Sequence, residues 1–311
     1  MTNRLQNRKI ILGYFFALGA TAIWSGNFII ARGLNESIPP ISLAFWRWVV
    51  AVVVFLPFAL KPLIIEWDIL KENIPYLSIT SLLGITIFNT LIYFAGHTTT
   101  AINLSLISIT FPVFIVILSR IFFRELLTVN KGIGIILVAT GVVLLITKGS
   151  PSKLLNISFA IGDVWMLVAA ITFAIYSILL KRKPKMLSIW AFQLSTFILG
   201  LIFLFPFFIL EYVTVPPVEF DTKTVFAILY VGIFASLSAF VLWNKAIVTV
   251  GPSKAGMIYY TLPLFSGVLA YFFLEEDISI IHFYSVSLIV SGIFTANYEF
   301  KNLKIASMKE A

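Results

Sequence analysis

FPVFIVILSRIFFRE, residues 111–125, returns in altered form as LPLFSGVLAYFFLEE, residues 262–276. The two stretches share a proline near the start and a glutamate at the end, each 151 residues apart: Pro112 with Pro263, and Glu125 with Glu276. The same offset aligns LVATGVVLLI (137–146) with LIVSGIFTAN (288–297). The chain is therefore predicted to consist of two related units, residues 1–149 and residues 150–311.

The composition is that of a membrane protein. Of the 311 residues, 60% are hydrophobic and 12% are charged, whereas about 25% of the residues in a soluble protein are charged. Apolar runs of about 20 residues can cross a bilayer as helices, because barrel strands are shorter and alternate in polarity. Ten such runs are expected: 11–31, 41–60, 74–95, 102–121, 131–147, 159–180, 188–210, 224–243, 254–274 and 281–299. We expect no cleavable signal peptide, and the lack of cysteine excludes disulfides and thiolate metal sites.

Each unit contains five of these runs, and five is an odd number. The second unit therefore enters the membrane in the orientation opposite to that of the first. Inverted repeats are typical of secondary transporters, in which the two halves exchange conformations around a central site. The sequence predicts an all-α integral membrane fold of ten transmembrane helices, arranged as two inverted five-helix repeats.

The basic residues predict the orientation. With a cytoplasmic N-terminus, most lysines and arginines fall on the cytoplasmic side, and only four fall outside: Arg32, Lys148, Lys153 and Lys223. Cytoplasmic loops of membrane proteins carry an excess of lysine and arginine. We therefore expect a multi-pass protein of the cytoplasmic (inner) membrane with both termini in the cytoplasm. The net charge of +8 is then a topology signal, and no nucleic-acid partner is expected.

The first unit resembles the first EamA repeat of the drug/metabolite transporter superfamily in three segments: AIWSGNFIIARGL (22–34), PISLAFWRWVV (40–50) and FPVFIVILSRIFFRELLTVNKGIGIILVATGVVLLI (111–146). GDVWMLVAAITFAIYSILLKRK (162–183) resembles the start of the second repeat. The resemblance implies a ten-helix transporter of amino acids, other metabolites or drugs, often acting in efflux. The chain departs from the family pattern in the order Trp24-Ser25-Gly26-Asn27 and in the acidic cluster Glu275-Glu276-Asp277.

Polar side chains deep in membrane helices mark the candidate site, because they usually face the bundle interior or a water-filled cavity. Asn89 and Tyr93 are four residues apart and share a helix face, and the repeat offset places Asn244 opposite Tyr93. The candidate substrate-binding residues are Trp24, Asn27, Asn89, Tyr93, Ser105, Ser108, Tyr176, Trp243, Asn244, Tyr259 and Tyr260. For each of them, helix packing or a place in the interfacial aromatic belt is the alternative.

A second group is expected to act in gating or in structure. Pro112 and Pro263 lack an N–H and so free the carbonyls of Ser108 and Tyr259. Glu125 and Glu276 lie at span ends and are expected to accept hydrogen bonds from backbone N–H groups of the helices that follow. Gln193 takes the place of Arg47 when AFWR (44–47) is aligned with WAFQ (190–193).

Arg47 lies within an apolar run, about 9 Å below the outer boundary at 1.5 Å per residue. Its side chain either snorkels to the interface beside Trp46 and Trp48 or turns inward. We expect an inward Arg47 that braces the outer half of the bundle, with binding of a substrate carboxylate as the second alternative.

The leading functional prediction is a secondary transporter that exports amino acids or related small solutes. The alternative is uptake of a cationic metabolite such as choline or S-adenosylmethionine, held by aromatic ring faces. No mid-span carboxylate, nucleophile set or phosphate-binding glycine loop is present, so an enzyme, a built-in ATPase and a cofactor are not expected. The expected partners are a small-molecule substrate and the lipid bilayer, and the sequence leaves the oligomeric state open.

Overall fold

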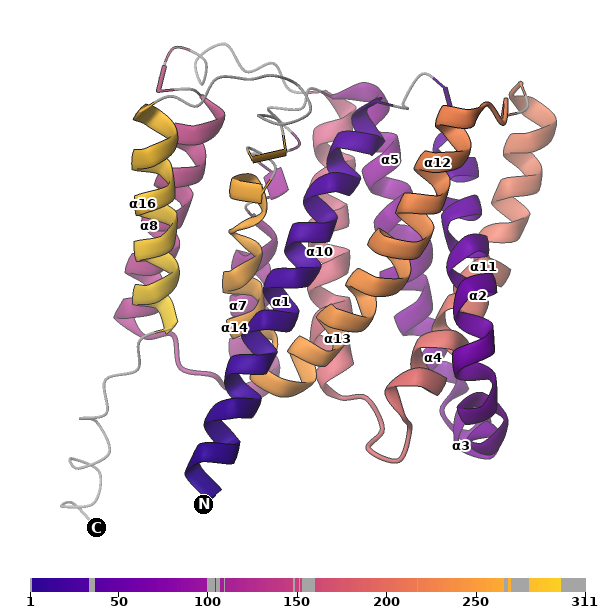
Figure 1. The fold of residues 1–311 in the computed structure, drawn as a ribbon, viewed down its shortest axis with the longest axis horizontal. Helices are drawn as coiled ribbons and strands as arrows, with labels where there is room; N and C mark the ends of the chain where they lie inside the picture. Colours follow the sequence, from indigo (N-terminus) through magenta and orange to yellow (C-terminus); the bar gives the residue numbers. More distant parts are fainter. Residues whose placement is uncertain are drawn as a thin grey trace.

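The computed structural model of the chain describes residues 2–33, 37–99, 104, 107–108, 110–147, 149–150, 152, 160–216, 218–265, 268–269 and 280–297. All regular structure within these ranges is helical, which confirms the predicted all-α class. The helices run roughly side by side in Figure 1, and the first helix begins at the lower end of the bundle in that view. This end is called the N-terminal end below.

The elements follow one another in chain order. They are α1 (Thr2–Gly33), α2 (Pro40–Ile65), α3 (Trp67–Glu72), α4 (Ile74–Ser81), the π-helix η1 (Leu82–Ile87), α5 (Phe88–Thr98), α7 (Thr110–Phe123), α8 (Val129–Ile146), α10 (Ile161–Lys181), α11 (Ile189–Thr214), α12 (Thr222–Tyr230), the π-helix η2 (Val231–Ser238), α13 (Ala239–Val250), α14 (Pro252–Tyr259) and α16 (Ile280–Asn297).

Six of the described helical segments are long and apolar enough to cross a membrane: Arg8–Asn27, Pro40–Ile65, Ile74–Thr98, Ile161–Lys181, Ile189–Thr214 and Thr222–Val250. Shorter apolar helices occupy Thr110–Phe123, Val129–Leu144 and Phe283–Ala296. These segments fall on nine of the predicted runs. The remaining run, 254–274, begins in α14 and continues into residues outside the described ranges. The chain is a multi-pass membrane protein, and the number ten stays a prediction.

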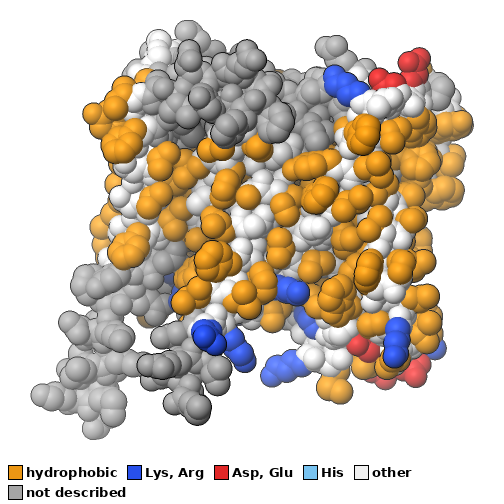
Figure 2. Space-filling view, viewed as in Figure 1, with side chains coloured by type: hydrophobic (Ala, Val, Ile, Leu, Met, Phe, Trp, Pro, Cys, Tyr) orange, Lys and Arg blue, Asp and Glu red, His pale blue; other side chains and the backbone are white. Residues whose placement is uncertain are grey.

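The outer surface matches a bilayer environment. Large apolar side chains face outward around the bundle, among them Phe58, Phe226 and Phe294, each more than two thirds exposed. Figure 2 shows these side chains covering the middle of the molecule, with lysine and arginine gathered toward the N-terminal end. Exposed apolar surface on this scale is unfavourable in water and favourable against lipid.

The helices α2 and α11 bind each other's ends. Glu211, near the end of α11, accepts hydrogen bonds from the backbone N–H groups of Ile41 (3.1 Å) and Ser42 (2.5 Å) at the start of α2. Glu66, at the end of α2, accepts one from the N–H of Ser188 (2.7 Å), which precedes α11. Each carboxylate satisfies donors that a helix N-terminus leaves unpaired. The two helices are therefore antiparallel and matched end to end.

Two π-helical turns, η1 and η2, sit at corresponding positions in the third and eighth predicted spans. Each contains a glycine against which another helix packs. A Cβ at Gly84 would lie 2.4 Å from the Tyr176 ring, and one at Gly232 would lie 2.5 Å from Val50. Single π-helical turns occur frequently at functional sites. Here they bring α10 and α2 close to the third and eighth spans.

A smaller apolar cluster joins α8, α14 and α16 at the side of the bundle (Figure 1). It contains Tyr260, because α14 ends at Tyr259 and a turn at Tyr260 and Thr261 separates it from the helical residues 262–265. Pro263 follows that turn. Pro112 is the third residue of α7, and residues 107 and 108 ahead of it are also helical.

Candidate functional site

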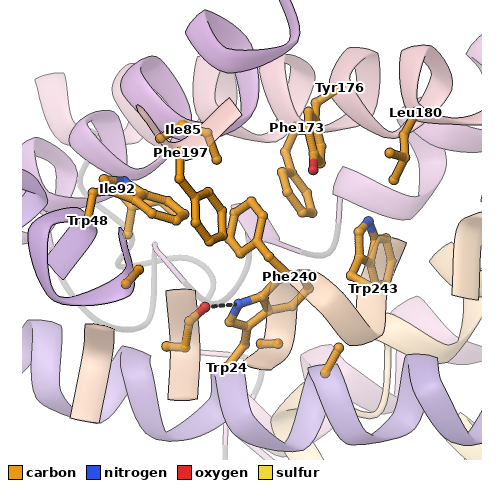
Figure 3. Close-up of a cluster of buried hydrophobic side chains, with 14 of the residues drawn as sticks. Trp24, Trp48, Ile85, Ile92, Phe173, Tyr176, Leu180, Phe197, Phe240 and Trp243 are labelled. Atoms are coloured by element: carbon orange, nitrogen blue, oxygen red, sulfur yellow. Dashed lines mark hydrogen bonds between the residues drawn. The ribbon is translucent and has the colours of Figure 1, made fainter. Parts of the chain in front are cut away.

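Six aromatic side chains meet at the centre of the bundle and are called the aromatic cluster: Trp24, Phe111, Phe173, Phe240, Trp243 and Tyr259. Trp24 contacts four of them, with ring centroids 5.5 Å from Phe173, 5.7 Å from Phe240, 5.4 Å from Trp243 and 6.2 Å from Tyr259. Phe111 lies against Tyr259 at 4.7 Å. The rings come from α1, α7, α10, α13 and α14, so both units contribute. Figure 3 shows the part of this cluster around Trp24, Phe240, Phe173 and Trp243.

Hydrogen bonds fix the two indoles of the cluster. The Nε1–H of Trp24 donates to the carbonyl of Ala235 in η2 (2.9 Å; dashed in Figure 3). The Nε1–H of Trp243 donates to the Ser177 hydroxyl (3.2 Å) in α10. The Trp24 bond joins the two units, and the Trp243 bond joins α13 to α10. The two indole rings are therefore held in a defined orientation.

Arg47 turns inward and is 1% exposed, so it does not snorkel to the interface. Its Nε–H donates to the Ser236 hydroxyl (2.6 Å), and Nη1 donates to the Tyr93 hydroxyl (2.5 Å). The guanidinium also lies over the Trp48 ring, with Cζ 5.1 Å from the ring centroid. Arg47, Tyr93 and Ser236 form the Arg47 network, which joins α2, α5 and η2.

Two corresponding residues of the second unit, Gln193 and Asn244, form the Gln193 network together with Tyr176. The Tyr176 hydroxyl donates to Asn244 Oδ1 (2.9 Å), and Asn244 Nδ2 donates to Gln193 Oε1. All three side chains are fully buried. The repeat alignment that pairs Arg47 with Gln193 and Tyr93 with Asn244 thus describes two polar networks of similar build, one charged and one neutral.

The two networks lie on either side of the aromatic cluster. Arg47 is six residues inside the Glu211 end of α2, and Gln193 is five residues inside the Glu66 end of α11. At 1.5 Å per residue their backbones are ~20 Å apart along the helix pair. Ring contacts connect both to the cluster: Trp48 lies 5.2 Å from Phe240, and Tyr176 lies 5.4 Å from Phe173.

The remaining sequence candidates divide into three groups. Asn27, Asn89 and Ser108 are buried, and Asn89 Nδ2 donates to the carbonyl of Gly84 in η1 (3.2 Å). Tyr260 is buried away from the aromatic cluster, in the cluster with α8 and α16. Ser105 and Glu276 lie outside the described residues.

Glu125 differs from expectation. Its carboxylate was predicted to accept from backbone N–H groups of the next helix, and this prediction is wrong. The side chain instead binds the Ser253 hydroxyl at the start of α14, Lys181 at the end of α10 (3.3 Å) and Lys131 in α8 (3.6 Å). The hydroxyl of Thr128 takes the capping position, since it accepts from the N–H of Lys131 (3.3 Å). Glu125 therefore ties both units together at the N-terminal end.

Acidification is expected to release this Glu125 cluster. Burial raises the pKa of the carboxyl, but the hydrogen bonds from Ser253 and Lys181 and the charges of Lys181 and Lys131 outweigh it and hold the pKa below its ordinary 4.5. A lowered folded-state pKa means that the ionised form stabilises the fold above the unfolded-state pKa, and that this stabilisation is lost as pH falls through the folded-state value. Glu125→Gln should lower the melting temperature at neutral pH and flatten its fall in acid.

The matched control is Glu72→Gln, because Glu72 is exposed. It should reproduce the wild-type melting curve at every pH. If Glu125→Gln also follows the wild-type curve from neutral pH into acid, the Glu125 cluster does not stabilise the folded chain.

Several residues of this site were not among the sequence candidates: Phe111, Phe173, Phe240, Ser236, Trp48, Glu66 and Glu211. The apolar rings give no signal that separates them from ordinary core residues. Glu66 and Glu211 did carry a signal. Each lies at the end of one of two helices, α2 and α11, whose starts are related by the alignment of AFWR with WAFQ. Ser236 is a polar residue within an apolar span, which is the pattern that marked the other candidates.

Comparison with known proteins gives the family. The EamA-like transporter family matches residues 11–147 and 160–298. An uncharacterized transporter of Archaeoglobus fulgidus is 31% identical over 268 residues, which cover 82% of this chain and 86% of the relative. Uncharacterized transporter YyaM of Bacillus subtilis is 25% identical over 287 residues, 91% of this chain and 93% of the relative.

A solved crystal structure shares the fold. It superposes with a TM-score of 0.72 at 18% identity and covers 96% of this chain and 99% of the other. Both halves of the chain match the family, and the relatives span nearly its whole length. The chain therefore belongs to the EamA-like transporter family.

Proposed function

We propose that the chain is a ten-helix secondary transporter of the cytoplasmic membrane that exports amino acids or related small solutes by alternating access. The observation that carries the proposal is the aromatic cluster, built by both units and placed between two polar networks. Ring faces suit the apolar part of a small amphipathic solute, and the hydroxyl and amide groups suit its polar part. A site formed by both halves is where alternating access requires the substrate to lie.

Features that recur in both units support the inverted repeat. Glu66, at the end of α2, binds the start of α11, and Glu211, near the end of α11, binds the start of α2. Each of the two π-helical turns also contains a glycine against which another helix packs. The Arg47 and Gln193 networks occupy equivalent places at opposite ends of the α2–α11 pair. A rocking motion of one unit against the other would exchange the environments of the two networks.

Orientation follows from the basic residues at the N-terminal end. Lys131 and Lys181 lie there, both paired with Glu125, and Figure 2 shows further lysine and arginine side chains toward this end. The positive-inside rule places this end in the cytoplasm. The Gln193 network then lies in the cytoplasmic half of the membrane and the Arg47 network in the outer half.

Uptake of a cationic metabolite is the second candidate, and the cluster itself favours it. Trp24, Trp243 and Tyr259 offer ring faces of the kind that bind quaternary ammonium groups. The charge distribution favours a solute with a carboxylate instead. Arg47 is linked to the cluster through Trp48 and Phe240, and its positive charge repels a cation.

Transport of an amino acid should depend on Tyr259. Tyr259→Ala removes the ring that touches Trp24, Phe111 and Trp243, so exchange of labelled solute in proteoliposomes should fall about tenfold or more, as expected for the loss of roughly 1.4 kcal/mol of binding. Tyr284→Ala is the matched control, because Tyr284 on α16 is 56% exposed and faces away from the cluster. Equal transport by the two variants would move the site elsewhere.

A panel of solutes separates the two candidate functions. Amino acids, choline and S-adenosylmethionine are added to the purified protein, and the melting temperature is measured, since a ligand stabilises the state it binds. The proposal predicts a rise with one or more amino acids. A rise with the quaternary or sulfonium cations alone would favour the second candidate and overturn the first.

A further inference from the structure

A positive charge lies in the interior of the bundle and has no negative partner among the residues that the structure describes. Arg47 is 1% exposed, and both groups that it binds, the hydroxyls of Tyr93 and Ser236, are neutral. The buried acidic side chains among the described residues are Asp163 and Glu211. Asp163 accepts from the N–H of Ala160 at the start of α10 (2.8 Å), and Glu211 caps α2. Neither therefore neutralises the guanidinium.

One hydrogen-bond donor of the Arg47 side chain has no acceptor among the described residues. Nε and Nη1 are bound, whereas Nη2 is buried and has no partner among the described residues. The Nε1–H of the neighbouring Trp48 is also buried without a partner there. A buried polar group without a hydrogen bond costs free energy, and an unpaired buried charge costs more. The two donors belong to side chains that touch each other, and one of the two side chains is charged, which suits an anionic group.

The positioning of Arg47 is that of a binding residue. Tyr93 and Ser236 hold two edges of the guanidinium, and the Trp48 ring lies along its face at 5.1 Å. The fork of the guanidinium is therefore oriented before any ligand arrives, with Nη2 left over. Guanidinium groups bind carboxylates through N–H groups presented in this planar geometry.

We propose that Nη2 of Arg47 binds the carboxylate of the transported solute, and that the aromatic cluster receives the rest of that solute. The inference rests on the proposed function and adds to it a named contact and a substrate class. The bracing role expected from the sequence and the binding role then belong to different atoms of one side chain, Nε and Nη1 for the first and Nη2 for the second.

The two units offer the carboxylate different partners on the two sides of the aromatic cluster. In the second unit the equivalent position is Gln193, whose Oε1 accepts from Asn244 and whose Nε2 has no partner among the described residues. An amide offers a neutral hydrogen bond where Arg47 offers a charge. The carboxylate is therefore held more tightly on the Arg47 side of the aromatic cluster than on the Gln193 side.

The test compares solutes that differ only at the carboxylate. Binding of apolar amino acids and of their carboxamides is measured from ligand-dependent melting of the purified full-length protein. Wild-type protein should prefer the acid by about tenfold or more, because a hydrogen bond to a charged group is worth more than one to a neutral group. Arg47→Gln installs the residue found at the equivalent position and should abolish that preference, because it lowers binding of the acid far more than binding of the carboxamide.

Arg8→Gln is the matched control, since Arg8 is an exposed arginine at the N-terminal end, and it should keep the wild-type preference. Arg47→Lys is the second variant, used if Arg47→Gln does not fold. It keeps a charge without the fork and should lose more affinity for the acid than for the carboxamide. A merely bracing Arg47 would instead weaken acid and carboxamide alike.

The results separate this inference from the function on which it rests. If amino acids stabilise wild type and Arg47→Gln with the same preference over the carboxamides, the carboxylate contact is wrong and the transporter proposal stands. If chloride in place of gluconate stabilises wild type and amino acids do not, the site holds an inorganic anion only and the inference fails. If amino acids and carboxamides both leave the wild-type melting temperature unchanged, both proposals fail.

Discussion

Gly134→Leu is expected to separate α8 from α16 and to destabilise the chain by about 3 kcal/mol or more, at the upper end of the cost of overpacking. A Cβ at Gly134 would lie 2.6 Å from the carbonyl oxygen of Gly292 and 2.7 Å from the backbone nitrogen of Ala296. Backbone atoms cannot rotate away as a side chain can. The leucine therefore forces the two helices apart, and thermal unfolding in detergent measures the loss.

Gly132→Leu provides the control two residues earlier on the same helix. A Cβ there meets no described atom within 4 Å, so leucine should leave the melting temperature unchanged or raise it slightly through its higher helix propensity. Equal melting of the two variants would mean that the close approach of α8 and α16 does not hold the protein together.

The second large effect concerns the exchange of helix caps between α2 and α11. Glu211→Ala and Glu66→Ala are each expected to lower the free energy of unfolding by about 1–2 kcal/mol, because each leaves N–H groups at a helix start unpaired. The two sites lie at opposite ends of the helix pair, so the double variant should lose the sum of the two effects. Thermal unfolding of the three variants measures this.

Glu219→Ala is the control for these variants, because Glu219 is exposed outside the helices. It should melt like wild type. If Glu211→Ala and Glu66→Ala do so as well, the reciprocal caps do not stabilise the α2–α11 pair, and one of the supports for the inverted repeat is lost.

Much of this arrangement could be predicted from the sequence. Composition and run length indicate the class, because an apolar surface this large requires lipid. The offset between the repeats predicted that Tyr93 and Asn244 hold equivalent positions. The structure places each in a polar network, one with Arg47 and one with Gln193. The depth of a residue in the membrane can be predicted from the sequence because it depends only on the distance along its helix, at 1.5 Å per residue.

Rotation about the helix axis was harder to predict. Tyr259 and Tyr260 were both candidates at the same depth, and one residue turns a side chain by about 100° on a helix. Tyr259 reaches the aromatic cluster, whereas Tyr260 packs with α8 and α16. The π-helical turns change this rotation further, and they have no signature in a single sequence. The partners of Glu125 depended on which helix ends meet in space, which helix order alone does not give.

Transport without an energy source tests the central claim most directly. Proteoliposomes are preloaded with an unlabelled amino acid that stabilises the protein, with no ATP and no ion gradient, and labelled amino acid is added outside. A secondary transporter that needs no mid-span carboxylate predicts a transient accumulation of label by exchange, reduced in Tyr259→Ala and retained in Tyr284→Ala. Label that enters liposomes with and without the protein at the same rate would contradict the account.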